Sequence, residues 1–148
     1  MINLTCPITD ISPLVPHSGE MVLLDRIIDF GSDYLIAEAK IKSDNILIKG
    51  NRLPSFLGAE IMAQGVAAWE GCRSVRAGKP INLGYWIGSR KLNLNKPYIE
   101  IGSQLEIAIK LSTEDESTGF GIFDCKLIDK QSREVLIEGA INVFSPPA

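Results

Sequence analysis

One continuous stretch, residues 54–77, constrains the fold of this chain more than any other part of the sequence. After its first residue it contains no proline and shows no strand-like alternation, so it predicts a helix about 36 Å long at ~1.5 Å per residue. Pro54 suits the first helical turn, Ser55 could cap it, and residues 78–80 (Gly-Lys-Pro) would end it.

This predicted helix is unusually rich in small side chains. They are Gly58, Ala59, Ala63, Gly65, Ala67, Ala68 and Gly71. Each glycine costs about 1 kcal/mol relative to alanine in a helix interior, and a surface helix gains nothing in return. A helix enclosed by other backbone does gain, because small side chains permit close approach. We therefore expect this helix to lie at the centre of the fold.

Strand-like segments flank the helix on both sides. Two candidates precede it, at residues 21–30 and 35–42, and a Gly-Ser-Asp turn between them predicts a hairpin. Four candidates follow it, at residues 83–93, 105–112, 120–129 and 135–145. In the second of these, Leu105, Ile107, Ile109 and Leu111 share one face. We predict one α+β domain over residues 1–148, in which a curved antiparallel sheet wraps around the helix.

Composition argues against several classes of function. The 148 residues are 45% apolar and carry a net charge of −3, which is not the basic footprint of a nucleic-acid-binding domain. We see neither a secretory signal nor an apolar stretch of about 20 residues, so we expect a cytoplasmic protein that does not enter a membrane. Three widely spaced cysteines match no disulfide or zinc pattern, and no phosphate-binding glycine motif is present. We expect no metal, nucleotide or redox cofactor.

Two side chains are candidates for acid–base chemistry. Glu60 lies among apolar and small helical residues, where a carboxylate is costly to bury unless it is paired or protonated. An apolar pocket would favour the neutral acid and suit Glu60 to donate a proton, with Gln64 one turn further on placed to orient it. Alternatively, Glu60 emerges at the surface or pairs with an arginine such as Arg26. His17, the single histidine, is either a base or a structural hydrogen-bonding residue.

Three segments carry a family resemblance. They are VPHSGEMVLLDRI (residues 15–27), LPSFLGAEIMAQ (53–64) and YWIGSRKLNLNKPYIEIGSQLEI (85–107). In this order they resemble the LPHRxPFLLVDRV, MPGVLxxEAMAQ and R-F-x-x-P-V-x-P-G-D-x-L segments of the hot-dog-fold 3-hydroxyacyl-[acyl-carrier-protein] dehydratases. The third segment keeps only Pro97, Gly102 and Leu105 of its pattern. The nearest variant is the divergent dehydratase of aryl polyene biosynthesis.

The resemblance implies a reaction and one catalytic residue. In this family a histidine removes the α-proton of a 3-hydroxyacyl thioester, and a glutamic acid facing it across a dimer interface protonates the departing hydroxyl, which yields a trans-2-enoyl thioester. Glu60 inherits the acid role, but the family's histidine position falls on Ile46. Three alternatives follow: His17 is the base, a related subunit supplies the histidine, or the chain is a non-catalytic acyl binder.

The resemblance also implies partners and substrate contacts. The partners are an acyl carrier protein and a second hot-dog subunit, in a homodimer or a heterodimer. The expected substrate-binding residues are Gly58, through its backbone N–H, together with Gln64, Met62 and Trp86. Two basic clusters are either docking sites for the acidic carrier or ordinary solvated faces: Arg73, Arg76 and Lys79, and Arg90, Lys91 and Lys96. A hot-dog acyl thioesterase is the alternative enzyme on the same scaffold.

Overall fold

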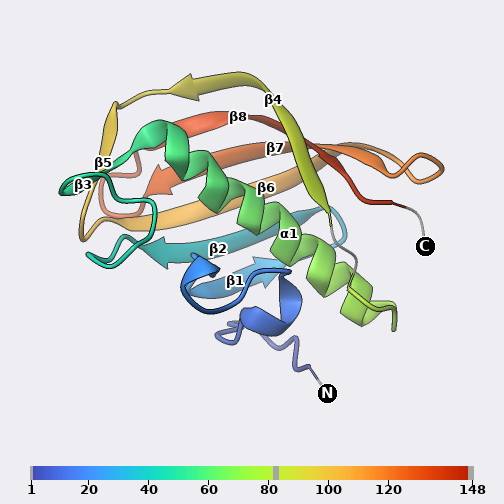
Figure 1. Ribbon diagram of the computed structural model, residues 1–148. Coiled ribbons are helices and arrows are strands. Elements are labelled where there is room, and N and C mark those ends of the chain that lie inside the picture. The colour runs from blue at the N-terminus through green and yellow to red at the C-terminus, as the bar shows by residue number, and fades with distance from the viewer. Residues whose placement is uncertain (1, 82–83, 147–148) are drawn as a thin grey trace.

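The computed structural model describes residues 2–81 and 84–146, and in them an antiparallel sheet curves around one long helix (Figure 1). The elements are η1 (Ser12–Leu14), η2 (Gly19–Met21), β1 (Arg26–Phe30), β2 (Tyr34–Lys40), β3 (Arg52–Pro54), η3 (Ser55–Gly58), α1 (Ala59–Arg76), β4 (Tyr85–Leu94), β5 (Tyr98–Glu100), β6 (Gln104–Asp115), β7 (Phe120–Asp129) and β8 (Val135–Phe144). The strand order of the large sheet is β1-β2-β6-β7-β8-β4, and β3 pairs with β5 near the start of α1. This is the α+β arrangement predicted from the sequence.

Helix α1 lies against the concave face of the sheet, and its small residues allow the close contact (Figure 1). At Gly65 a Cβ atom would come within 2.9 Å of side-chain atoms of Ile107 and Ile109 on β6. At Gly71 a Cβ atom would overlap the backbone carbonyl oxygen of Leu14 in η1. The prediction of an enclosed central helix is therefore confirmed, and the glycines are needed where the sheet and the N-terminal segment touch it.

The start of the helix differs from the prediction. Pro54 ends β3, and the chain forms the 3₁₀ turn η3 before α1 begins at Ala59. Ser55 does not cap the helix: its Oγ atom is buried and has no hydrogen-bond partner among the described residues. The Ser55 backbone N–H donates instead to the Pro97 carbonyl oxygen at 3.0 Å. Pairing of β3 with β5 thus fixes the entry to the helix.

The predicted strands are present, with shifted ends. β1 and β2 form the expected hairpin, but residues 19–21 form the turn η2, so β1 begins only at Arg26. The candidate at residues 83–93 corresponds to β4, and its first residue, Leu83, lies outside the described residues. β3 and β5 were not expected, because three-residue strands are too short to show an alternating pattern.

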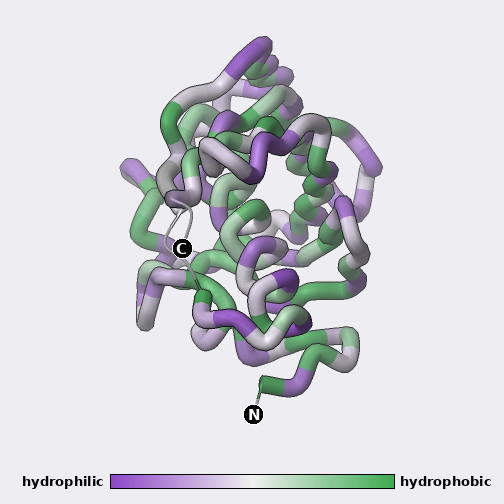
Figure 2. The backbone as a smooth tube through the Cα atoms, turned by 90° about the vertical axis from the view of Figure 1, so that its right-hand side faces the viewer, coloured by the Kyte–Doolittle hydropathy of each residue, from purple (hydrophilic) through white to green (hydrophobic). Residues whose placement is uncertain are grey.

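The core fills the space between sheet and helix. Leu105, Ile107 and Ile109 point into it, as their alternation predicts. In Figure 2 hydrophobic stretches follow the helix and strands, while the most hydrophilic stretches lie at outer turns. Register shifts within the β1–β2, β6–β7, β7–β8 and β4–β8 pairs mark bulges, which bend a sheet. No helix in the described part of the chain is long and apolar enough to cross a membrane.

Candidate active site

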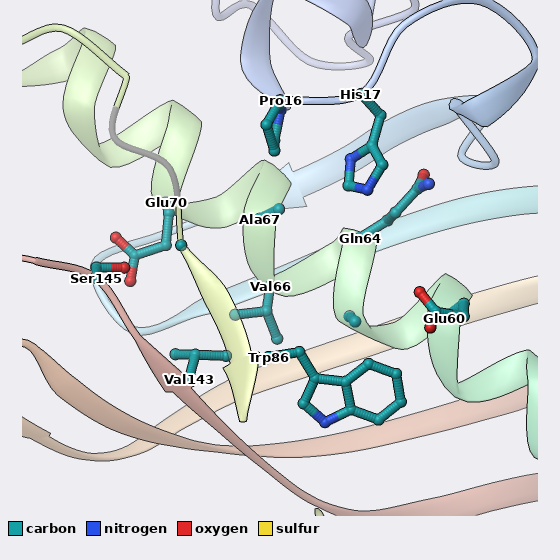
Figure 3. A pocket seen from close by; sticks show the side chains of 12 residues that line it. Pro16, His17, Glu60, Gln64, Val66, Ala67, Glu70, Trp86, Val143 and Ser145 are labelled. Atoms are coloured by element: carbon teal, nitrogen blue, oxygen red, sulfur yellow. The ribbon is translucent and has the colours of Figure 1, made fainter. Parts of the chain in front are cut away.

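A pocket of about 130 Å³ lies between α1, the segment before η2, and the facing ends of β4 and β8. Four of the six residues expected at the site line it: His17, Glu60, Gln64 and Trp86. In Figure 3 the imidazole of His17 points toward α1 beside Gln64, Glu60 follows along the same helix, and the indole ring of Trp86 lies across from them. The fold therefore brings a histidine and a carboxyl group of one chain to one hollow.

Gln64 fixes the segment that carries His17. The Gln64 Oε1 atom accepts a hydrogen bond of 2.8 Å from the Leu23 backbone N–H, and Nε2 donates to the Met21 carbonyl oxygen at 2.5 Å. Its side chain is buried, being only 3% exposed. We expected the Gln64 amide to orient Glu60. This is corrected, because both polar atoms of the amide bind the backbone of residues 21–23, which follow His17 in the chain.

His17 is held between two anchored stretches of chain. On its N-terminal side Leu14 and Val15 are buried in the core, and on its C-terminal side Gln64 binds the backbone. The side chain is half-buried, and its buried Nδ1 atom has no hydrogen-bond partner among the described residues. Its position is thus set by backbone anchoring, and a ring nitrogen remains for substrate, water or another subunit.

Glu60 is exposed in the single chain, contrary to the expectation of a dry pocket within the protomer. It lies on the one face of α1 that the sheet does not cover. The suggested pairing with Arg26 is also wrong, because Arg26 Nε binds Glu38 Oε1 at 2.6 Å. Glu60 forms no ion pair with any described residue. Exclusion of water from this carboxyl group would require a second chain over the pocket.

Gly58 and Met62 do not line the pocket. Met62 is fully buried in the core, and a Cβ atom at Gly58 would meet Ile137 Cδ1 at 2.7 Å on the sheet side. The predicted substrate contact of the Met62 side chain is corrected for this reason, whereas the contact expected from the Gly58 backbone N–H stays a prediction. Trp69 is likewise a core residue, and its indole N–H donates to the Gly31 carbonyl oxygen at 2.9 Å.

A second carboxyl group, Glu70, lines the same pocket and was missed at the sequence level. Burial raises the pKa of Glu70 even though Arg73, bound at 2.9 Å, opposes this effect. The sequence could have indicated this position, because the spacing of three and four residues puts Glu70 on the same helical face as Glu60, Ala63 and Ala67. Between residues 59 and 70 these are the four positions that α1 does not bury.

The described residues give little support to a metal site or to a cysteine nucleophile. Among residues 2–81 and 84–146, no three His, Cys, Asp or Glu side chains gather in a way that could hold a metal ion. Burial raises the pKa of the Cys72 and Cys125 thiols to about 12, which disfavours the nucleophilic thiolate. The titratable groups that face the pocket are therefore His17, Glu60 and Glu70.

Comparison with known families and structures shows what this chain is similar to. Residues 9–148 match the family described as ApeP-like, ApeP dehydratase. A chain of the dehydratase heterocomplex ApeI:P from Xenorhabdus doucetiae is similar, with a TM-score of 0.84 and 26% identity over 92% of this chain and 90% of that one. No curated protein matches the chain.

More distant structures share the fold alone. A hypothetical thioesterase with coenzyme A from Streptococcus pneumoniae TIGR4 has a TM-score of 0.60 and 13% identity, over 82% of this chain and 87% of that one. The PaaI protein from the phenylacetic acid degradation operon of E. coli has a TM-score of 0.60 and 11% identity, over 80% of each chain. Together with the heterocomplex chain they confirm the hot-dog fold that the sequence resemblance implied.

Proposed function

The chain belongs to the ApeP-like dehydratase family, and we propose that it dehydrates 3-hydroxyacyl thioesters carried on an acyl carrier protein, with His17 and Glu60 of the same chain as base and acid. The observation that carries this proposal is that both side chains line one pocket. The sequence contains no other imidazole, and imidazole is the side chain that most often serves as a general base.

The proposed reaction has two proton transfers. A nitrogen of neutral His17 takes the proton from the α-carbon. The electron pair of the broken C–H bond then forms the double bond to the β-carbon. The bond between the β-carbon and the hydroxyl breaks, and the carboxylic acid of Glu60 protonates the departing oxygen. The products are an enoyl thioester and water, and transfer of the proton from His17 to Glu60 through solvent resets the site.

A second hot-dog subunit is part of the proposal. Glu60 is exposed in the single chain, and a water-excluding cover would strengthen the electrostatic interactions of both catalytic groups. β4 forms one edge of the sheet, and its side chains Trp86, Ile87 and Leu94 are between 38% and 54% exposed. Pairing at this edge would place the partner beside the pocket, to which Trp86 belongs. The similarity to a chain of the ApeI:P dehydratase heterocomplex supports a related partner subunit.

Docking of an acidic carrier would use basic residues that are not already neutralised. Arg73 is occupied by Glu70 and Glu114, and Lys96 binds Glu134 at 3.1 Å. Arg90 and Lys91 are exposed on β4 and form no ion pair with the described residues. Arg76 and Lys79 are likewise exposed and form no ion pair with the described residues, so these four are the carrier contacts we propose. The cytoplasmic location stays a prediction.

Mass spectrometry of a carrier-bound substrate tests the function. The purified protein, alone and with its hot-dog partner, is incubated with a 3-hydroxyacyl carrier protein, and the intact carrier is weighed. Loss of one water supports dehydration, whereas appearance of the free carrier thiol would indicate the thioesterase alternative. Glu60→Gln should lower the rate by roughly 100-fold or more, and Glu116→Gln, on an exposed turn, should not.

The second candidate is a non-catalytic subunit that completes the site of its partner. Glu60 is exposed in the single chain and the pocket is open, which is what a chain that only completes the site of its partner would show. A partner subunit is needed whether or not this chain is catalytic. The second candidate predicts an obligate heterodimer whose dehydration survives His17→Ala and fails only when the partner loses its own histidine.

A further inference from the structure

The pocket has a second polar end that the proposed reaction does not use. Glu60 and Glu70 both line it, and they are ten positions apart on α1, which corresponds to about 15 Å along the helix axis. Figure 3 shows Glu70 beside Ser145 at the end opposite Glu60, with Val66 between the two carboxyl groups. A linear acyl chain that reacts beside Glu60 would therefore direct its tail toward Glu70.

One oxygen of the Glu70 carboxylate is open to solvent or to a ligand. Arg73 binds Glu114 with both terminal nitrogens, at 2.9 Å to Oε1 and 2.7 Å to Oε2, which is a bidentate pair. Glu70 receives one hydrogen bond from Arg73 Nη2, at 2.9 Å to Oε2. Its Oε1 accepts no hydrogen bond from the described residues, although the side chain is only 21% exposed. Because Glu114 already neutralises the charge of Arg73, the negative charge of Glu70 is left uncompensated by this pair.

The surroundings of Glu70 decide which tail would be bound well. Val66 and Val143 flank the pocket here and are 2% and 8% exposed. A methyl-terminated tail would remove water from the free oxygen and give no hydrogen bond in return, which is unfavourable. A hydroxyl group would donate to it. An ammonium group would donate to it as well, because Glu70, Arg73 and Glu114 together carry a net charge of −1.

We propose that Glu70 is a specificity-determining residue at the tail end of the pocket, where its free carboxylate oxygen accepts a hydrogen bond from a hydroxyl or amino group at the end of the acyl chain. The proposal rests on the dehydratase function argued above and adds a preference among its substrates. The raised pKa of Glu70 fits a carboxyl group that lacks full solvation.

Matched substrates test this assignment. Three carrier-bound 3-hydroxyacyl chains of equal length end in a hydroxyl, a methyl or an amino group, and kcat/KM is measured with the assembled dehydratase. The wild type should prefer the hydroxyl-ended chain over the methyl-ended chain by roughly 10- to 100-fold. Glu70→Leu should abolish this preference, mainly through KM of the hydroxyl-ended chain. Glu116→Gln is the control, because Glu116 lies on an exposed turn, does not line the pocket and does not bind Arg73.

A second variant covers loss of folding in Glu70→Leu. Glu70→Gln keeps the shape but replaces a charged acceptor by a neutral one, so it should reduce the preference without abolishing it. Equal rates on hydroxyl- and methyl-ended chains in the wild type, a full preference in Glu70→Gln, or an amino-ended chain that reacts no faster than the methyl-ended chain would each overturn the inference. In those cases dehydration itself still supports the proposed function. Failure to dehydrate any of the three chains would overturn both.

Discussion

Replacing Gln64 by alanine should loosen the segment that carries His17. The substitution removes the acceptor for the Leu23 N–H and the donor to the Met21 carbonyl oxygen, from a side chain that is 3% exposed. A typical hydrogen bond contributes about 0.5–1.5 kcal/mol, and a partly buried group left unsatisfied costs about 1–3 kcal/mol. Because water can reach the exposed turn at Met21, we expect a loss of about 2–4 kcal/mol in the free energy of unfolding.

Urea unfolding of the assembled protein at fixed concentration measures this loss, and hydrogen exchange locates it. Amide exchange should rise over residues 15–24 before it rises over β6 and β7. Gln64→Glu is the matched variant: it keeps the acceptor but sets a carboxylate against the Met21 carbonyl oxygen. Its stability should therefore recover as the pH falls and the protonated carboxyl becomes a donor. A loss below about 0.5 kcal/mol in Gln64→Ala, with unchanged exchange at residues 15–24, would refute the anchoring role.

Three further predictions follow from packing and titration. Gly71→Ala should destabilise the fold by about 2–4 kcal/mol despite better helix propensity, because its Cβ would overlap the Leu14 carbonyl oxygen; thermal unfolding measures this, and an unchanged Tm would contradict it. Burial raises the folded pKa of Glu70, so its charged form opposes folding: Glu70→Gln should be more stable than the wild type at neutral pH, and the difference should vanish in acid, as urea unfolding at both pH values would show. Cys72 and Cys125 should resist alkylation until the protein unfolds, as intact mass would report; labelling of either in the native state would contradict their burial.

The sequence was sufficient for the architecture because composition and periodicity act locally. The small residues of α1 required an enclosing sheet, and the alternation at Leu105, Ile107 and Ile109 identified the face that encloses it. The ends of the helix and strands were harder to predict from the sequence. η3 and the short strands β3 and β5 depend on contacts between distant segments, such as the Ser55 N–H with the Pro97 carbonyl oxygen.

The candidate site was predictable only in part, for a similar reason. His17 and Glu60 were identified as single residues of unusual chemistry, but the pattern could not reveal that they line one pocket. Met62 was assigned to substrate because it lies in the same motif as Glu60, although a helix turns it toward the core. Glu70 lies outside that motif, and only the surroundings of its carboxyl group distinguish it from an ordinary surface acid.

Mixing two inactive variants gives the most direct test of acid and base acting within one chain. His17→Ala and Glu60→Gln chains are assembled separately and together with the same partner, and dehydration of a carrier-bound 3-hydroxyacyl chain is measured. If both residues serve the same pocket, each variant alone is inactive and the mixture is no more active than either. Activity restored in the mixture would mean that the two groups come from different chains, and full activity of His17→Ala would mean that another residue is the base. Either result would contradict the account.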